Sequence, residues 1–357
     1  MKKPLLEILI GTYKRPDFAI KAVNSCLSIE DDRLNVFCHS NGYDEKLNYL
    51  NSLGSRVRYG YFEKNMGVWK NYGKLLSETR GKYCMILSDE DRINTRDIIM
   101  FLDWLEKDCD PDIAVINCSI YDEDKKKYYY RPSNNLTNFG LSYVLYCEAW
   151  QHTVISGFVY RVSFLESIDI EHDLRKSLGN VYCHINLATS LLKSAKHAVY
   201  RNPVVIKGKG ATTGGEAYEH IKQTDGDMRH KYGVNPKIYS AYARGRQFFY
   251  MQRKIHSLYP NRRVALFFYD LRNVIYFYNC IVRSNRVTGR SDNYYREIKK
   301  AKIDAKHSSE YFDSGFSKIF PYLYKVEVVR HVIKTIDIFI KRIFNPVMAR
   351  FIFYFNK

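Results

Sequence analysis

Three adjacent carboxylates, Asp89, Glu90 and Asp91, are the side chains of this chain whose types and spacing most clearly indicate chemistry. They follow the apolar run at residues 83–88, which is typical of a buried strand. Carboxylates packed this closely repel one another unless a cation lies between them. Because strand ends in α/β sheets are where ligand sites form, the triplet indicates a divalent metal over a bound phosphate compound. An acidic turn facing solvent is the alternative.

Polar turns also follow the other short apolar runs of the N-terminal part. Strands are predicted at residues 5–10, 35–38, 57–62 and 113–118, and helices at residues 18–27, at 68–77 and after a capping Thr95. This alternation predicts an α/β fold with a mostly parallel sheet and helices on both faces. The ends of such strands line one crevice, so we expect their polar residues to face a single ligand. These residues are Thr12, Arg15, Asn41, Asp44, Asn65 and Asp89.

The composition is that of a globular protein with an unevenly placed positive charge. Residues 241–357 carry 23 Lys and Arg against 8 Asp and Glu, so they hold +15 of the net charge of +18. This asymmetry predicts contact with a polyanion, which could be an anionic membrane, a nucleic acid or a phosphorylated substrate. The eight cysteines form no CxxC pair, which favours a reducing compartment over a zinc or disulfide framework. We expect neither a signal peptide nor a transmembrane helix.

The order of these motifs resembles the GT-A fold of family 2 glycosyltransferases. The opening turn of that family, which touches the donor nucleotide, is similar to Gly11–Pro16, and the turn after its second strand is similar to Asn41–Asp44. Its asparagine-glycine motif, which precedes the helix behind the metal site, resembles Asn65–Gly67 followed by Asn71. Its acidic metal motif resembles Ser88–Asp91. The resemblance is good over residues 4–120 and loose over residues 150–200.

This resemblance implies transfer of a sugar from a nucleotide-diphosphate sugar to a saccharide acceptor, in the manner of enzymes that build bacterial surface polysaccharides. It implies Asp91 as the direct ligand of Mn²⁺ or Mg²⁺, and Asp89 as a contact to the ribose or, through water, to the metal. It also implies a wider set of donor-binding residues. They are Thr12, Tyr13, Arg15, Asn41, Asp44, Asn65, Gly67, Asn71, Asp89 and Glu90.

Two positions depart from the family pattern. Ser40 stands where the family usually has an Asp that reads the base, so the choice between UDP and GDP stays open. Gly73 stands at the place of the second asparagine, and Asn71 is expected to replace it.

If the family position of the catalytic Asp is carried over to residues 181–188, the resemblance implies His184 as the general base. An imidazole accepts a hydroxyl proton near neutral pH, but a structural histidine in the interior fits the same position. Other candidates are Glu148, His152 and Asp173, and an enzyme that retains configuration needs no such base.

The predicted organisation is a GT-A catalytic domain at residues 1–215 and a basic helical region at residues 216–357. The catalytic domain divides into a nucleotide-sugar half at 1–120 and an acceptor half at 121–215. The glycine-rich segment at 207–216 is predicted to be a lid over the diphosphate, with a surface linker as the alternative.

A helix at residues 325–344 and its aromatic, basic sequel are predicted to contact an anionic membrane, although a core-facing helix gives the same pattern. The resemblance then implies a polyprenyl-diphosphate-linked acceptor. It also implies a cytoplasmic protein, peripheral on the inner face of the bacterial cytoplasmic membrane.

Three rival functions differ in class. Nucleic-acid binding fits the charge, but no RNA- or DNA-binding motif is present, so we expect no nucleic-acid partner. A non-catalytic sugar-binding protein of the same fold fits poorly with an intact acidic triplet. A nucleotidyltransferase also uses strand-end carboxylates, but its glycine-rich phosphate loop is missing after the first strand.

Overall fold

A computed structural model describes most of the chain. The described residues are 3–122, 125–128, 136–137, 155–170, 183–191, 194–208, 241–288, 294–307, 314–324, 332 and 335. The chain divides into two compact units, of which the first contains a β-sheet and the second contains the helices from Ala241 onward. The predicted boundary between residues 215 and 216 falls outside the described residues and stays a prediction.

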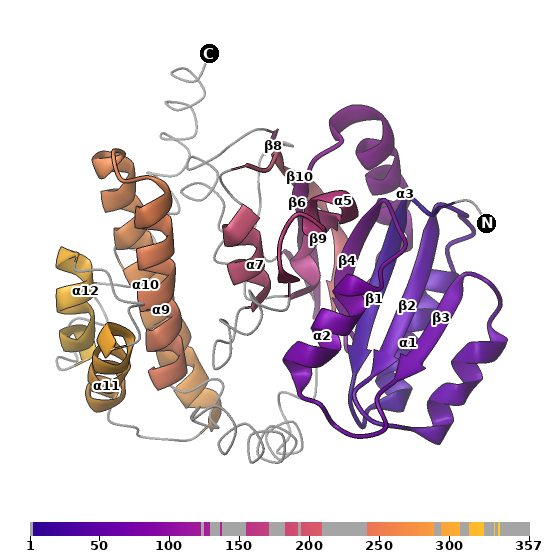
Figure 1. The fold of residues 1–357 in the computed structure, drawn as a ribbon, viewed down its shortest axis with the longest axis horizontal. Helices are drawn as coiled ribbons and strands as arrows, with labels where there is room; N and C mark the ends of the chain where they lie inside the picture. Colours follow the sequence, from indigo (N-terminus) through magenta and orange to yellow (C-terminus); the bar gives the residue numbers. More distant parts are fainter. Residues whose placement is uncertain are drawn as a thin grey trace. The chain divides into compact units, whose positions relative to one another are not determined.

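The first unit is built around one sheet that has ten strands among the described residues (Figure 1). Their bounds are β1 Leu6–Thr12, β2 Leu34–Ser40, β3 Val57–Tyr61, β4 Tyr83–Ser88, β5 Arg92–Ile93, β6 Ile113–Asp122, β7 Lys125–Tyr128, β8 Leu136–Thr137, β9 Phe158–Arg161 and β10 His197–Lys207. The order is β3-β2-β1-β4-β9-β6-β10-β5, with β7 on β6 and β8 on β10.

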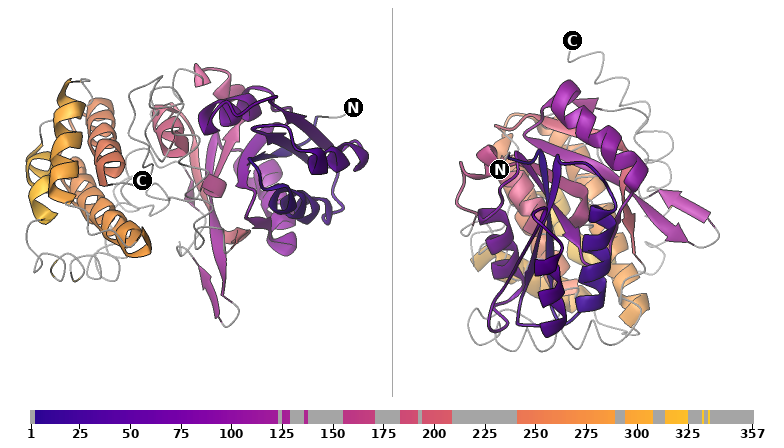
Figure 2. Two further views of the ribbon diagram at one scale, coloured as in Figure 1. Left: turned by 90° about the horizontal axis from the view of Figure 1, so that it is seen from below. Right: turned by 90° about the vertical axis from the view of Figure 1, so that its right-hand side faces the viewer.

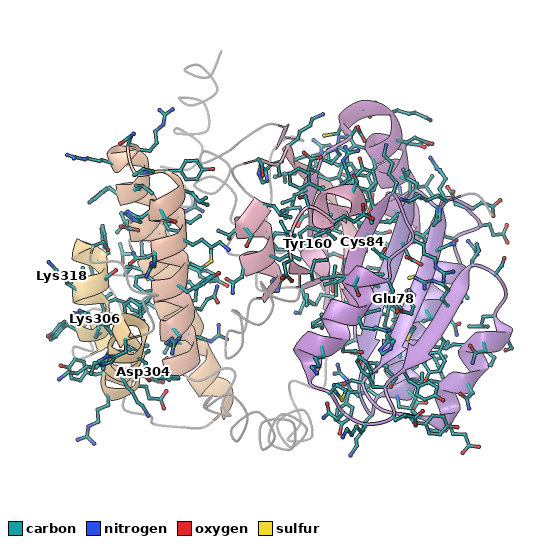
Figure 3. All side chains as sticks on the ribbon, viewed as in Figure 1. Glu78, Cys84, Tyr160, Asp304, Lys306 and Lys318 are labelled. Carbon is teal, nitrogen blue, oxygen red and sulfur yellow. The ribbon has the colours of Figure 1, made fainter. Side chains whose placement is uncertain are left out.

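The strands of this sheet are mostly parallel, as the sequence predicts. Strands β1 to β4 are parallel to one another, and β10 is parallel to β6. Strand β9 runs against both of its neighbours, β4 and β6, and Figure 3 shows its Tyr160 near Cys84 of β4, with which it is in register. The beginning of β9 therefore lies at the same edge of the sheet as the end of β4.

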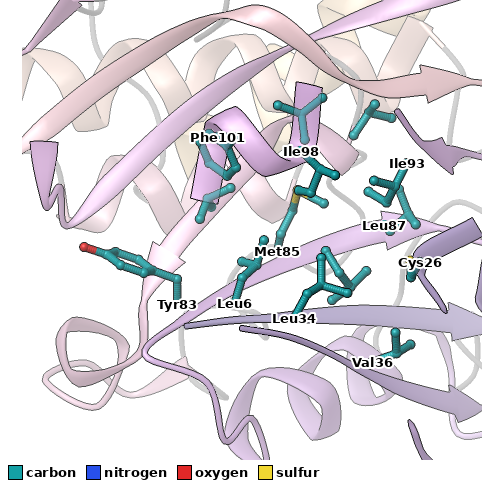
Figure 4. Packing of buried hydrophobic residues seen from close by; sticks show 14 of the residues in the cluster. Leu6, Cys26, Leu34, Val36, Tyr83, Met85, Leu87, Ile93, Ile98 and Phe101 are labelled. Carbon is teal, nitrogen blue, oxygen red and sulfur yellow. The ribbon is translucent and has the colours of Figure 1, made fainter. Parts of the chain in front are cut away.

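Helices cover both faces of the sheet (Figure 2). The α-helices of this unit are α1 Pro16–Leu27, α2 Val68–Ser77, α3 Thr95–Asp103, α5 Val162–Leu165 and α7 Cys183–Leu191. Shorter turns are the 3-10 helices η1 Glu45–Ser52 and η4 Ile155–Gly157, and the π-helical turn η2 Trp104–Cys109 that extends α3. Helices α1 and α3 share one hydrophobic cluster with alternate residues of the central strands, which Figure 4 shows around Leu6, Met85 and Phe101.

The intervening strand residues point to the opposite face, where α2 packs closely on β1. A side-chain carbon at Gly11 would lie 3.1 Å from the Asn71 amide nitrogen of α2. Leu9 and Ile86 on this face are 0% and 2% exposed, so the sheet is buried on both sides, as a parallel sheet requires.

One predicted helix cap is wrong by one residue. Asn94, and not Thr95, is the N-cap of α3, because its side-chain oxygen accepts the backbone N–H of Arg96 at 3.2 Å. The Asn94 amide nitrogen also donates to Asp97 and to the backbone carbonyl of Pro203 in β10, at 2.6 and 3.0 Å. Asn94 is therefore held at the cap position by a contact with a strand distant in sequence. A local sequence pattern does not reveal such a contact.

The second unit is helical, as predicted. Its elements are α9 Ala241–Leu258, α10 Arg263–Thr288, α11 Tyr294–His307, α12 Gly315–Ile319 and the 3-10 helix η6 Phe320–Tyr324. The rings of Phe248 and Phe320 stack with centroids 3.9 Å apart in its core. None of the helices in the described ranges is both long and apolar enough to cross a bilayer. The membrane-contacting helix predicted at 325–344 lies outside the described residues, apart from Val332 and Thr335.

Candidate active site

The first two carboxylates of the acidic triplet are held by the turn that follows β1. Strands β1 and β4 are paired up to Gly11 and Ser88, so both turns leave the same edge of the sheet. The Thr12 hydroxyl donates to Asp89 at 2.8 Å, and the guanidinium of Arg15 donates to both oxygens of Asp89, with its Nε at 3.1 Å. The same guanidinium reaches Glu90 at 3.5 Å.

Asp91 is held by different parts of the chain. The Ser156 hydroxyl, which lies in η4 just before β9, donates to Asp91 Oδ2 at 2.6 Å and accepts the backbone N–H of Ser88 at 2.9 Å. The backbone N–H of Gly208, just after β10, donates to Asp91 Oδ1 at 3.0 Å. Both oxygens of this carboxylate are therefore oriented by elements 65 and 117 residues away in the sequence.

The contact at Gly208 requires glycine. A side-chain carbon at this position would lie 1.9 Å from the backbone carbonyl oxygen of Glu90, which is far inside van der Waals contact. The clash is with backbone, so no rotamer change relieves it. Gly208 is thus the residue that lets the end of β10 approach the triplet closely enough to bind Asp91.

Burial dominates the electrostatics of these two carboxylates. Asp89 and Asp91 are each 1% exposed. Burial raises the pKa of Asp89 to about 6, although Arg15 and the Thr12 hydrogen bond oppose the increase. Burial also raises the pKa of Asp91, against the opposing effects of Lys207, Ser156 and Gly208. The surrounding protein therefore compensates the two negative charges only in part, which favours binding of a further cation.

The donor set at Asp91 fits a hard divalent cation. Its hydrogen bonds from Ser156 and Gly208 come from neutral groups, a hydroxyl and an amide, whereas Asp89 already carries a guanidinium. Mg²⁺ and Mn²⁺ prefer carboxylate oxygens and take their remaining ligands from substrate phosphates and water. Among the described residues no group of three or more His, Cys, Asp or Glu is arranged to hold a metal. A cation at Asp91 would accordingly depend on a bound diphosphate for much of its coordination.

Two of the predicted donor-binding asparagines form the framework of a neighbouring loop. The Asn41 amide nitrogen donates to Asn65 at 2.6 Å, and its oxygen accepts the backbone N–H of Met66 at 2.8 Å. The Asn65 oxygen also accepts the N–H of Gly67 at 2.9 Å, and Gly67 has a φ of +88°, which favours glycine. Since the backbone N–H of Asn41 donates to Thr12 at 2.8 Å, this loop is fixed to the turn that holds Asp89.

Contacts within the protein also involve three other positions from the sequence analysis, Asn71, Asp44 and Ser40. The Asn71 oxygen lies 2.6 Å from His39 Nδ1, and its amide nitrogen donates to the His39 carbonyl at 3.1 Å, which joins α2 to β2. Asp44 caps η1 by accepting the N–H of Lys46 at 3.1 Å. Ser40 donates to the Gly42 carbonyl at 2.6 Å, so its hydroxyl stabilises its own turn. The donor contacts of Asn71 and Asp44 stay predictions.

Tyr13 and His184 lie in different surroundings. Tyr13 is next to Gly42, where a side-chain carbon would meet its ring at 3.5 Å. His184 is buried in the first turn of α7, with its ring centroid 5.4 Å from that of Phe158, and its carbonyl accepts the Tyr160 hydroxyl at 2.9 Å. Its role as the base stays a prediction. The other candidates, Glu148, His152 and Asp173, and the lid residues after Gly208 lie outside the described residues.

The contacts of Ser156 and Gly208 with Asp91 were not predicted from the sequence, although Gly208 belongs to the predicted lid segment. The signal for Ser156 was its position before Gly157 and a short apolar strand, in the segment already expected to lie beside the acceptor. The signal for Gly208 was a glycine among lysines, just after the apolar residues 203–206. Neither signal identifies Asp91 as the partner, because both contacts are long-range.

Comparison with known families gave a match within the sheet unit. The model of "Glycosyl transferase family 2" matches residues 7–169, slightly less than half of the chain. Comparison with curated protein sequences gave no match.

Solved structures of TarS from S. aureus are similar in shape at low identity. Residues 1–349 of TarS share 10% identity at a TM-score of 0.47, with coverage of 90% of this chain and 91% of that one. The same fragment in complex with UDP-GlcNAc shares 10% identity over the same fractions, at a TM-score of 0.48. A longer TarS structure shares 12% identity at a TM-score of 0.47 and is covered over 55% of its length.

The family match covers β1 to α5, which include the acidic triplet, the Thr12–Arg15 turn and Ser156. The mostly parallel sheet with helices on both faces is the GT-A arrangement that the sequence motifs predicted. Residues 7–169 of this protein therefore form a domain of glycosyl transferase family 2.

Proposed function

We propose that this glycosyltransferase transfers a sugar from a nucleotide-diphosphate sugar with the help of a divalent cation held by Asp91. The observation that carries the proposal is the pair of buried carboxylates, Asp89 and Asp91, whose negative charge the protein compensates only in part. Such a pair at the carboxyl edge of an α/β sheet is suited to a cation and a phosphate ligand.

Each carboxylate has a separate role in the proposed mechanism. When bound, Mn²⁺ or Mg²⁺ neutralises the charge that develops on the leaving diphosphate. Ser156 and Gly208 orient the oxygens of Asp91, so the ligand geometry is set before substrate arrives. Arg15 and Thr12 orient Asp89, which is proposed to contact the ribose of the nucleotide, and the burial of both carboxylates strengthens their interaction with a bound cation.

The donor is proposed to lie along the turns that follow β1, β2 and β3. Hydrogen bonds among Thr12, Asn41 and Asn65 hold these turns together, which supports a preformed binding surface. Ser40 donates to Gly42 within its own turn, which leaves the choice between UDP and GDP to other groups. Tyr13, Glu90 and Gly67 are the remaining proposed donor contacts.

His184 is proposed to accept the proton of the acceptor hydroxyl if the enzyme inverts configuration. Neutral imidazole has the basicity that this step needs near pH 7. Its place at the start of α7, against Phe158 of β9, supports a role on the side of the site that Ser156 also occupies. His184→Ala is expected to lower turnover sharply if this is right, and unchanged turnover would exclude the residue.

The acceptor is proposed to be a saccharide on a polyprenyl-diphosphate carrier, met at the inner face of the bacterial cytoplasmic membrane. The strongly basic sequence from residue 241 onward supports an anionic surface as partner.

The proposed function is tested with a panel of nucleotide sugars, first by thermal shift with and without Mn²⁺ and then by transfer of radiolabelled sugar to membrane extracts. We expect one donor to stabilise the protein only when the cation is present. Asp91→Asn should abolish both effects and remain folded, whereas the exposed Asp103→Asn should behave as the wild type. Full transfer by Asp91→Asn, or in excess chelator, would refute the metal role.

A further inference from the structure

Helix α11 of the second unit separates its charges between two faces. Its two carboxylates point to α9, where Glu297 accepts the backbone N–H of Tyr242 at 3.0 Å and Asp304 accepts the Tyr242 hydroxyl at 2.6 Å. Ile298, Ala301 and Ala305 are buried on this inner side. The acidic residues of the helix are therefore engaged in packing and do not contribute to its outer face.

The outer face is cationic along the length of the helix. Arg296, Lys299, Lys300, Lys306 and His307 are all exposed, and their spacing of three, four and seven residues puts them on one side of an α-helix. The Lys299 and Lys300 ammonium groups lie over the rings of Tyr295 and Tyr242, at 5.9 and 5.8 Å, so aromatic rings support their stems.

Exposed apolar side chains accompany this cationic stripe. Ile303 lies within the stripe and is 45% exposed. Ile319 and Tyr322, in the adjoining α12 and η6, are 47% and 54% exposed, and the ring of Tyr322 contacts Tyr295 of α11 with centroids 5.6 Å apart. Lys318 is also exposed, and Figure 3 shows it on the same side of this unit as Lys306.

We propose that the outer face of α11, with the adjoining α12 and η6, docks on an anionic lipid membrane. Lysines within reach of the headgroups supply the electrostatic attraction, and aliphatic side chains between them enter the acyl boundary. Nucleic acids offer the same charge, but the exposed aliphatic side chains of Ile303 and Ile319 provide neither the phosphate contacts nor the base stacking through which nucleic acids bind. Docking through this surface brings the enzyme to a lipid-linked acceptor, and in that respect the proposal rests on the proposed function.

The test uses the full chain and sedimentation with vesicles of phosphatidylglycerol and phosphatidylcholine, compared with phosphatidylcholine alone. The variant replaces Lys299, Lys300 and Lys306 with Gln. Because each lysine near an anionic surface contributes about 1 kcal/mol, binding to the anionic vesicles should weaken roughly a hundredfold. A matched control replaces the exposed Lys3, Lys21 and Lys107 of the first unit with Gln, removes the same charge and should change binding less than about threefold.

A second variant, Ile303→Ser, tests the apolar part of the surface. It should weaken binding to anionic vesicles even at high salt, where electrostatic attraction is screened. Equal loss in the lysine variant and its control, binding that ignores phosphatidylglycerol, or binding of DNA without binding of vesicles would overturn the proposal.

Thermal shift by the donor and Mn²⁺ separates this proposal from the proposed function. All of these variants should keep the donor-induced shift, because none of the residues belongs to the sheet-edge site. If vesicle binding fails while the shift persists, only the docking surface is wrong. If the shift is missing while vesicle binding follows the prediction, the docking surface stands and the proposed function falls.

Discussion

Replacement of Gly208 by alanine should impair transfer without unfolding the protein. The added carbon would lie 1.9 Å from the Glu90 carbonyl oxygen. Ordinary carbon–oxygen contacts begin at about 3.3 Å, so the two backbone segments must separate by about 1.4 Å. The hydrogen bond from Gly208 to Asp91, now 3.0 Å, would then be broken.

The size of the effect follows from the bond that is lost. A hydrogen bond to a charged group contributes about 1.5–3 kcal/mol, so the cation-binding geometry of Asp91 should lose that amount. We expect kcat/KM to fall roughly tenfold to a hundredfold, with a parallel increase in the Mn²⁺ concentration needed for half-maximal rate. The melting temperature reports whether the fold is intact.

Gly315→Ala is the matched control for this experiment. A side-chain carbon at Gly315, in the first turn of α12, meets nothing within 4 Å. This variant should leave transfer unchanged and alter stability by less than about 1 kcal/mol. If Gly208→Ala kept its kcat/KM within about threefold of the wild type, the argument that the close approach of Gly208 orients Asp91 would be refuted.

Three further predictions address the site and its support. Ser156→Ala should reduce Mn²⁺ affinity about tenfold or more in a direct titration, whereas the exposed Ser167→Ala should not. Arg58→Met should lower the free energy of unfolding by about 3–5 kcal/mol in urea, because it leaves the buried Glu7 carboxylate, now 3.0 Å from the guanidinium, without its cation. The raised pKa of Asp89, about 6 against an ordinary 3.8, means that the folded protein holds a proton that the unfolded chain releases. Stability without metal should therefore fall by up to about 3 kcal/mol as pH rises from about 4 to about 6, and Asp89→Asn should remove this part of the pH dependence.

The parts of the fold that local patterns determine were predictable from the sequence. Strand β4 is a continuous apolar run that ends at the triplet, and α2 begins and ends as its apolar spacing predicted, at Val68 and Ser77. The Thr12–Arg15 turn was expected to lie near Asp89, and the structure brings these residues together.

The parts that depend on distant partners were not predictable. Asn41, Asn65 and Asn71 have the polar character of ligand-binding residues, but polarity alone does not distinguish a ligand contact from a hydrogen bond inside a loop framework. Strand β10 was not predicted to join the sheet, and its end carries the amide that binds Asp91. Such contacts depend on which strands pair in the sheet. A single sequence does not directly show this pairing.

The antiparallel insertion of β9 has a consequence for the order in which the protein folds. The partners of Asp89 lie within the first 90 residues, but the hydroxyl that holds Asp91 comes 65 residues later and the amide 117 residues later. Closing such long loops is entropically slow, and the N-terminal part of a chain leaves the ribosome first. The turns that are proposed to bind the nucleotide can therefore form early, whereas Asp91, the proposed cation ligand, gains its final orientation only after β9 and β10 have joined the sheet. The orientation of Asp91 is thus delayed until the sheet is nearly complete, and a chain that stops before residue 155 lacks both groups that provide it.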